Sequence, residues 1–134
     1  VGSPATGGNS TVTAFQLQNT GTAFAPVTTT TLAGPAVGVS LDPTERFLYV
    51  GGLGQMWTVT LDANGGFGSA TATQTGGAGT VTTLGDYPGG AAGAPDARVW
   101  GAESDNLVFA VSTVGATTQT VRLTAIPVGI GFVP

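Results

Sequence analysis

The sequence predicts an all-β fold, a sandwich or an open barrel-like antiparallel sheet of about eight strands, with essentially no helix. The 134 residues include 23 glycines and eight prolines, which leave no window for a stable helix of a dozen residues. Short segments with a strand pattern recur at intervals of roughly 8 to 12 residues, as in β-rich domains. A chain of this length predicts one β-rich domain, residues 1–134, with extended segments at 1–10 and 127–134.

Five segments in the first half of the chain have a strand pattern. In residues 55–61 (QMWTVTL) apolar and polar side chains alternate, whereas residues 46–50 (RFLYV) form a dense apolar run that is typical of a central strand. In residues 10–18 the alternation slips near Phe15. Asp, Asn, Pro and Gly separate the segments because these residues favour tight turns. The remaining two segments are residues 26–32 and 36–41.

Glycine-rich stretches interrupt the second half of the chain. Residues 86–96 (DYPGGAAGAPD) predict a long loop. The tail, residues 127–134 (PVGIGFVP), is apolar but too rich in Gly and Pro for a central strand, so we expect an edge strand or a docking arm. Further strands are predicted at residues 69–74, 80–84, 97–102, 106–113 and 117–126.

The charge of the chain is very sparse. Charged residues make up 7% of the sequence, against about 25% in a typical soluble domain. Three arginines and no lysine, with a net charge of −4, exclude a nucleic-acid-binding surface and an anionic membrane surface as expected partners. A surface covered by Thr, Ser, Gln and Asn suits burial in an assembly, so an extracellular or cell-surface location of a secreted protein is expected.

Several other classes of protein are excluded by missing residues. There is no cysteine for disulfides or thiolate metal sites, and no segment approaches the roughly 18 apolar residues of a membrane-spanning helix. The sequence begins at Val1 without a methionine, which fits a mature chain whose leader was removed, a fragment or a trimmed chain.

The sequence predicts no enzyme, cofactor or metal. Ser and Thr are abundant, but without His or Lys the common partners that activate a hydroxyl group are missing. Three carboxylates, Asp96, Glu103 and Asp105, lie near one another in the sequence and suit either a carboxylate pair or a Ca²⁺ site. Ser104-Asp105-Asn106 is also typical of a turn before a strand, and this interpretation is favoured. Residues 51–54 (GGLG) lack the Lys of a phosphate-binding loop and predict an ordinary loop.

Aromatic residues supply the candidate contacts. Trp57, Trp100 and Tyr49 lie in strand patterns and are expected in the core. Tyr87, in the predicted long loop, and Phe132, in the tail, are the candidate contacts with a neighbouring subunit.

Two segments are candidates for sugar attachment. Asn9-Ser10-Thr11 has the pattern of an N-glycosylation acceptor, which makes Asn9 a candidate glycosylation site in a secreted chain. The four threonines of residues 28–31 suit either O-linked sugars or an exposed strand.

Part of the chain resembles a known family. LDPTERFLYVGG (residues 41–52) resembles the repeat of the YVTN-type, lactonase-like β-propellers, with a Pro-containing turn followed by an apolar strand that ends in Tyr-Val. QMWTVTLDANGGF (55–67) resembles the strand and turn that follow in that repeat. STVTAFQLQNTGTAFAPV (10–27) resembles the same phrase one repeat earlier, with Phe15 and Val59 in matching positions 44 residues apart.

The resemblance covers about residues 11–68 and implies blades of a wheel of strands. A closed propeller needs at least four blades of about 40 residues each, and this chain holds three at most. The resemblance therefore implies a fragment or an oligomeric wheel, and no catalytic residue is carried over from it.

The function expected first is that of a non-enzymatic, secreted structural subunit of an extracellular assembly: a filament, pilus-like fibre, surface layer or virion shell. Sheet edges and terminal segments, residues 3–18 and 127–134, would join it to copies of itself or to a companion chain, which in a pilus-like fibre would be helical. Two alternatives remain: a partial β-propeller-type binding or hydrolytic module, and a carbohydrate-binding β-sandwich with a row of exposed aromatic side chains.

Overall fold

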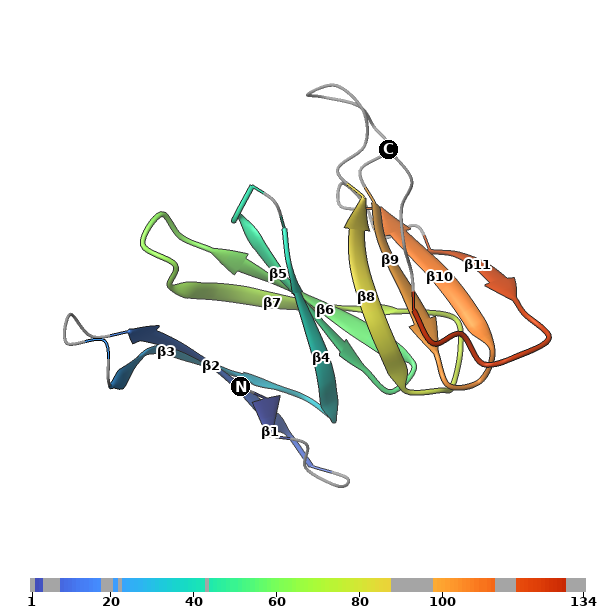
Figure 1. Ribbon diagram of the computed structural model, residues 1–134, viewed down its shortest axis with the longest axis horizontal. Helices are drawn as coiled ribbons and strands as arrows, with labels where there is room; N and C mark the ends of the chain where they lie inside the picture. The colour runs from blue at the N-terminus through green and yellow to red at the C-terminus, as the bar shows by residue number, and fades with distance from the viewer. Residues whose placement is uncertain are drawn as a thin grey trace.

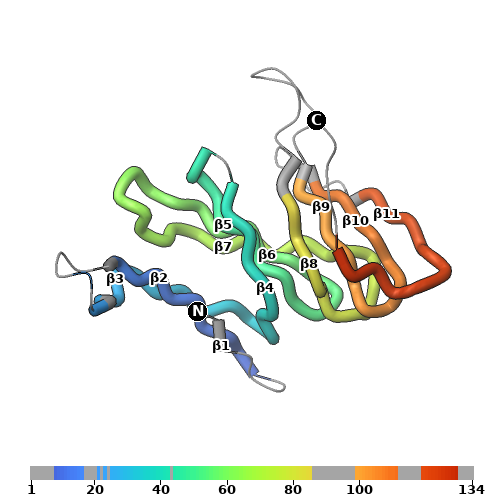
Figure 2. The backbone as a smooth tube through the Cα atoms, viewed as in Figure 1, coloured from blue at the N-terminus to red at the C-terminus, as the bar shows by residue number. Residues whose placement is uncertain are grey.

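The chain forms three antiparallel sheets that lie side by side (Figure 1). The computed structural model describes residues 2–3, 8–17, 21, 23–42, 44–87, 98–112 and 118–129. These residues contain no helix, which confirms the predicted all-β class. The sheets follow one another along the chain, as the colour sequence in Figure 2 shows.

Consecutive strands are neighbours in every sheet. The N-terminal sheet contains β1 (Gly2–Ser3), β2 (Ser10–Leu17) and β3 (Phe24–Leu32). The middle sheet contains β4 (Ala36–Leu41), β5 (Phe47–Gly52), β6 (Gln55–Leu61) and β7 (Phe67–Gln74). The C-terminal sheet contains β8 (Val81–Tyr87), β9 (Arg98–Glu103), β10 (Leu107–Ser112) and β11 (Thr118–Arg122). The two four-stranded sheets are therefore up-and-down meanders.

The middle sheet is buried on both faces. Successive side chains of a strand point to opposite faces, so Tyr49 of β5 packs toward the C-terminal sheet while Val50 packs toward the N-terminal sheet. Met56 and Trp57 of β6 divide in the same way. The dense apolar run at residues 46–50 is thus a central strand, as predicted. The first core cluster joins Tyr49, Met56, Val81, Val99, Leu107, Phe109 and Val111, and the second joins Val12, Leu32, Ala36, Val50, Trp57 and Val59.

Carboxylate-centred turns connect the strands of the middle sheet. Between β4 and β5, Asp42 accepts hydrogen bonds from the Thr44 hydroxyl and, at 3.3 Å, from the Arg46 amide. Between β6 and β7, Asp62 Oδ1 accepts from the amides of Asn64 and Gly66, both at 2.8 Å. The turns predicted from Asp, Asn and Gly are therefore present, and the side chain of Asp satisfies the backbone donors.

Some strand limits differ from the prediction. Asp86 and Tyr87 belong to β8, where Tyr87 pairs with Arg98, so the predicted loop starts too early. β11 ends at Arg122 and does not reach residue 126. The slip near Phe15 is a register shift between Ala14 and Phe15 in the pairing of β2 with β3.

Glycines let the middle and C-terminal sheets approach closely. A Cβ atom at Gly51 would lie 2.6 Å from Cγ1 of Val81. A Cβ atom at Gly101 of β9 would overlap the ring of Phe109, which is fully buried beside it on β10. The missing side chain at Gly101 is therefore the space that the Phe109 ring fills.

The change Gly101→Ala is expected to lower the free energy of unfolding by about 1–3 kcal/mol, because the new methyl group must displace the Phe109 ring. Gly38→Ala is the matched control, since a Cβ at this strand glycine meets nothing within 4 Å. Urea denaturation followed by tryptophan fluorescence measures both. Equal stability of the two variants would contradict this account of the interface.

Candidate functional site

The turn between β9 and β10 holds two of the three predicted carboxylates. Glu103 ends β9, and Ser104, Asp105 and Asn106 form the turn, in which Asn106 has a positive φ of 70°. The favoured turn interpretation of these residues agrees with their position. Asp96 lies outside the described residues, so the proximity of all three carboxylates stays a prediction.

The segment that links β7 to β8 packs over this turn. The amide of Ala78 donates to Asp105 Oδ2 at 3.1 Å, and the amide of Thr80 donates to Ser104 Oγ at 2.9 Å. In return, the amide of Ser104 donates to the carbonyl of Thr80 at 2.9 Å. We name this segment, residues 75–80, the linker, because it joins the middle sheet to the C-terminal sheet. The turn and the linker therefore form one hydrogen-bonded unit.

Glu103 is fully buried where the linker meets the turn. Neither of its carboxylate oxygens meets a donor in good hydrogen-bond geometry. A Cβ atom at Gly77 of the linker would overlap Oε2 of Glu103, so the backbone lies directly against the carboxyl group. Burial raises the pKa of Glu103, and the nearby negative charge of Asp105 raises it further, although the Thr75 hydroxyl acts in the opposite direction.

Asp105 has the opposite shift. The hydrogen bond from the Ala78 amide is the main cause that lowers its pKa, and Arg122 adds to it. Arg122 Nη1 lies 3.5 Å from Asp105 Oδ2 and donates to the Asp105 carbonyl at 3.0 Å. The neighbouring carboxyl groups are thus unequal, because Glu103 favours the proton and Asp105 favours the charge.

This arrangement can hold a positive charge but offers little to a substrate. Glu103 has no exposed surface, so a molecule in solvent does not reach its carboxyl group in this conformation. A proton shared with Asp105 or a bound cation would offset the cost of burying this carboxyl group without donors.

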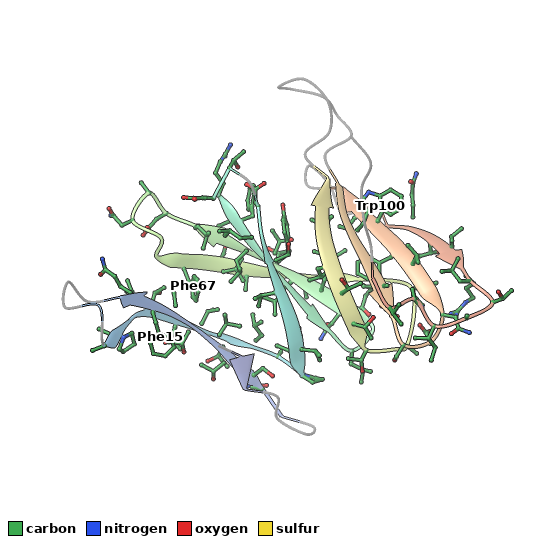
Figure 3. All side chains as sticks on the ribbon, viewed as in Figure 1. Phe15, Phe67 and Trp100 are labelled. Atoms are coloured by element: carbon green, nitrogen blue, oxygen red, sulfur yellow. The ribbon has the colours of Figure 1, made fainter. Side chains whose placement is uncertain are left out.

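An apolar groove lies at the other side of the middle sheet. It has a volume of about 300 Å³ and separates β2 from β4 to β7. Val39 and Leu41 of β4 line it although they are 58% and 50% exposed, and Figure 3 shows Phe67, which also lines it, beside the middle sheet. We name this space the β2–β4 groove. Its apolar lining predicts that it is covered when the protein has a partner.

The N-terminal sheet is incomplete beside this groove. β1 pairs with Thr11 and Val12 of β2. Among the described residues, no strand lies on the same side of β2 from Ala14 to Leu17. The backbone of this part of β2 is therefore available to an added strand.

The other predicted site residues are scattered. Asn9 is exposed immediately before β2, whereas Ser10 is buried and accepts a hydrogen bond from the Ala36 amide at 2.9 Å. Glycosylation of Asn9 stays a prediction. Tyr87 is the last residue of β8, but its side chain lies outside the described part of the structure, as does Phe132. The threonines of residues 28–31 belong to β3, in agreement with the strand alternative.

The aromatic residues divide between core and surface. Trp57 and Tyr49 are buried in the two core clusters, as predicted. Trp100 is not, because it lies on the face of β9 that points away from the middle sheet, where it is half-buried beside Val108 and Val121 (Figure 3). The prediction for Trp100 is wrong, since an alternating strand alone does not tell which of its faces will be covered.

Sequence reasoning missed the linker. Thr75 has a fully buried hydroxyl group without a hydrogen-bond partner, and its position beside Glu103 depends on the packing of two sheets. The glycines of residues 76–79 carried a signal, because a backbone without side chains can enclose a buried group.

No family model, no curated protein and no solved structure matches this chain. In the part of the chain that the structure describes, no helix has the length and apolar character needed to cross a membrane.

Glu103→Gln is expected to raise the melting temperature at pH 7 by about 2–5 °C in the presence of a chelator. Since folding raises the pKa of Glu103 above the unfolded value of 4.5, its contribution to stability is complete below pH 4.5 and declines as the pH rises toward the folded pKa. The variant lacks this decline, so it should gain over the natural protein at pH 7 and match it near pH 4.

Thermal unfolding between pH 4 and pH 8 measures this difference. The titratable or charged side chains that face Glu103 and its partner are Asp105 and Arg122. Glu45→Gln, at an exposed turn position, is the control and should show no comparable gain. A natural protein whose stability increases between pH 5 and pH 7 relative to Glu103→Gln would contradict the raised pKa.

Proposed function

We propose that this chain is a non-enzymatic, secreted structural subunit of an extracellular assembly, and that it associates through the open side of its N-terminal sheet. The observation that carries this proposal is the incomplete strand pairing of β2 beside the β2–β4 groove. Two unmet requirements coincide there, because backbone groups of β2 await a partner and apolar side chains of β4 await cover.

An added β-strand meets both requirements at once. Pairing with residues 14–17 of β2 would supply backbone hydrogen bonds, and its side chains would cover Val39 and Leu41. Burial of apolar surface contributes about 25 cal/mol per Å², so covering these side chains favours association. The sparse charge of the chain supports the same proposal, since such a surface opposes contact with a second copy only weakly.

The tail of a neighbouring copy is the proposed strand. Its sequence from residue 128 to 134, VGIGFVP, has the same pattern as residues 37–43, VGVSLDP, which include most of β4. In this match Phe132 takes the position of Leu41. We therefore keep Phe132 as a candidate subunit contact. A filament, fibre, surface layer or shell would each result from repeated exchange of such a strand, according to the angle between copies.

The second candidate is a β-propeller-type binding module. A specific observation favours it: the two meanders stack on each other, with their first strands, β4 and β8, in contact. Prolines at positions 43, 88 and 134 follow β4, β8 and the matching tail pattern at spacings of 45 and 46 residues. In such a module further blades, rather than a second copy, would cover the N-terminal sheet.

A carbohydrate-binding surface gains less support. Two of the four large ring residues, Trp57 and Tyr49, are core residues, and the described side chains form no exposed aromatic row. The two candidates above are therefore the ones to separate by experiment.

Purified protein is expected to form oligomers at micromolar concentration, and Leu41→Asp is expected to weaken this association about tenfold or more, because it places a charge in the groove. Val27→Asp is the matched control, since Val27 on β3 is 52% exposed and lies outside the groove. Sedimentation velocity measures the oligomers, and circular dichroism shows whether each variant is folded.

Phe132→Asp tests the tail separately and should weaken association as much as Leu41→Asp does. A natural protein that stays monomeric at high concentration would overturn the structural-subunit proposal and leave the propeller-type module. Equal loss of association in the Val27→Asp control would overturn the proposed role of the groove.

A further inference from the structure

Four oxygen atoms without hydrogen-bond partners gather between the linker and the β9–β10 turn. They are both carboxylate oxygens of Glu103, Oδ1 of Asp105 and the hydroxyl oxygen of Thr75, and all four are buried. The two carboxyl groups and the hydroxyl group interact directly, since Thr75 and Asp105 both act on the pKa of Glu103. A buried carboxylate without a donor or a cation is strongly unfavourable, so this cluster requires a positive charge.

The chain supplies no side chain that could provide this charge to Glu103. It contains no lysine and no histidine. Arg122 contacts Oδ2 and the carbonyl of Asp105, while its own side chain is 60% exposed, so it serves the other side of the turn. The Thr75 hydroxyl is an independent sign of an absent partner, because it is a neutral group, fully buried beside the carboxyl pair, and has no partner either.

Glycine backbone closes the remaining sides. Gly77 lies against Oε2 of Glu103, and a Cβ atom at Gly79 would lie 2.8 Å from Oδ1 of Asp105. The space beside the oxygens therefore accepts a small ion or a proton but not a further side chain. Backbone carbonyl groups and water are the ligands available to complete a coordination shell there.

We propose that Glu103, Asp105 and Thr75 form a binding site for a divalent cation, and that the cation is Ca²⁺. All of the ligands are oxygen atoms, which suits a hard cation and disfavours zinc, copper and other metals that prefer nitrogen or sulfur. The described residues contain no group of three or more carboxylate, His or Cys side chains, so the site has two charged ligands. Two carboxylates predict a weak site, with a dissociation constant of roughly 10⁻⁴–10⁻³ M, in the range of extracellular calcium modules.

The cation would join two sheets. Thr75 follows β7 of the middle sheet, whereas Glu103 and Asp105 belong to the C-terminal sheet and its turn. Binding would therefore stabilise the contact between the sheets and leave the β2–β4 groove unaffected. The inference is independent of the proposed assembly function.

Calcium titration of the full chain at pH 7, after treatment with a chelator, tests the site. Calcium at about one hundred times the dissociation constant is expected to raise the melting temperature by about 5–10 °C, and magnesium should do so less. Glu103→Gln and Asp105→Asn should each abolish most of this rise, while Glu45→Gln should retain it. Sodium chloride at the same ionic strength controls for screening of charges.

A second measurement distinguishes the cation from a shared proton. Because calcium must replace the proton that Glu103 holds, its addition to weakly buffered protein should release protons, and Glu103→Gln should release none. Absence of both the thermal shift and the proton release in the natural protein would overturn the proposal and leave a carboxyl pair that shares a proton. A thermal shift that Glu103→Gln and Asp105→Asn retain in full would overturn it too, since calcium would then bind elsewhere.

Discussion

The structure depends on the burial of the middle sheet on both of its faces. Adjacent residues of β5, Tyr49 and Val50, belong to two different core clusters, so one strand anchors both neighbouring sheets. A sheet of this kind cannot keep one wet face, which explains why residues 46–50 are apolar without interruption. The other sheets need only one apolar face each, and their strands carry correspondingly more threonine and alanine.

The two interfaces of the middle sheet differ in how completely they are closed. Toward the C-terminal sheet, glycines permit close contact, and the linker seals the end of the interface around Glu103. Toward the N-terminal sheet, the contact stops at Val12, and the groove lies beyond it. The closed interface therefore offers an interior site for a small ion, and the open one offers a surface for a macromolecular partner.

Local patterns in the sequence predicted most of the strands and turns. The alternation of residues 55–61 and the Asp-centred turns depend on near neighbours along the chain, and both were correct. The outer position of Trp100, the second meander and the surroundings of Glu103 depend on which sheets meet, which no local pattern records. The regular spacing of three prolines was a usable signal for the second meander, because it extends the blade-like period beyond the first half.

The meander connectivity also has a consequence for the order of folding. Each strand pairs with the next one along the chain, so hairpins form from segments a few residues apart, on a timescale of roughly microseconds. Docking of one sheet on another joins more distant segments and pays a larger loop-closure entropy, which makes it the slower event. Since both outer sheets dock on β5 and β6, the middle hairpin is the expected nucleus, and a chain emerging from the ribosome would complete its first interface before the last sheet has been synthesised.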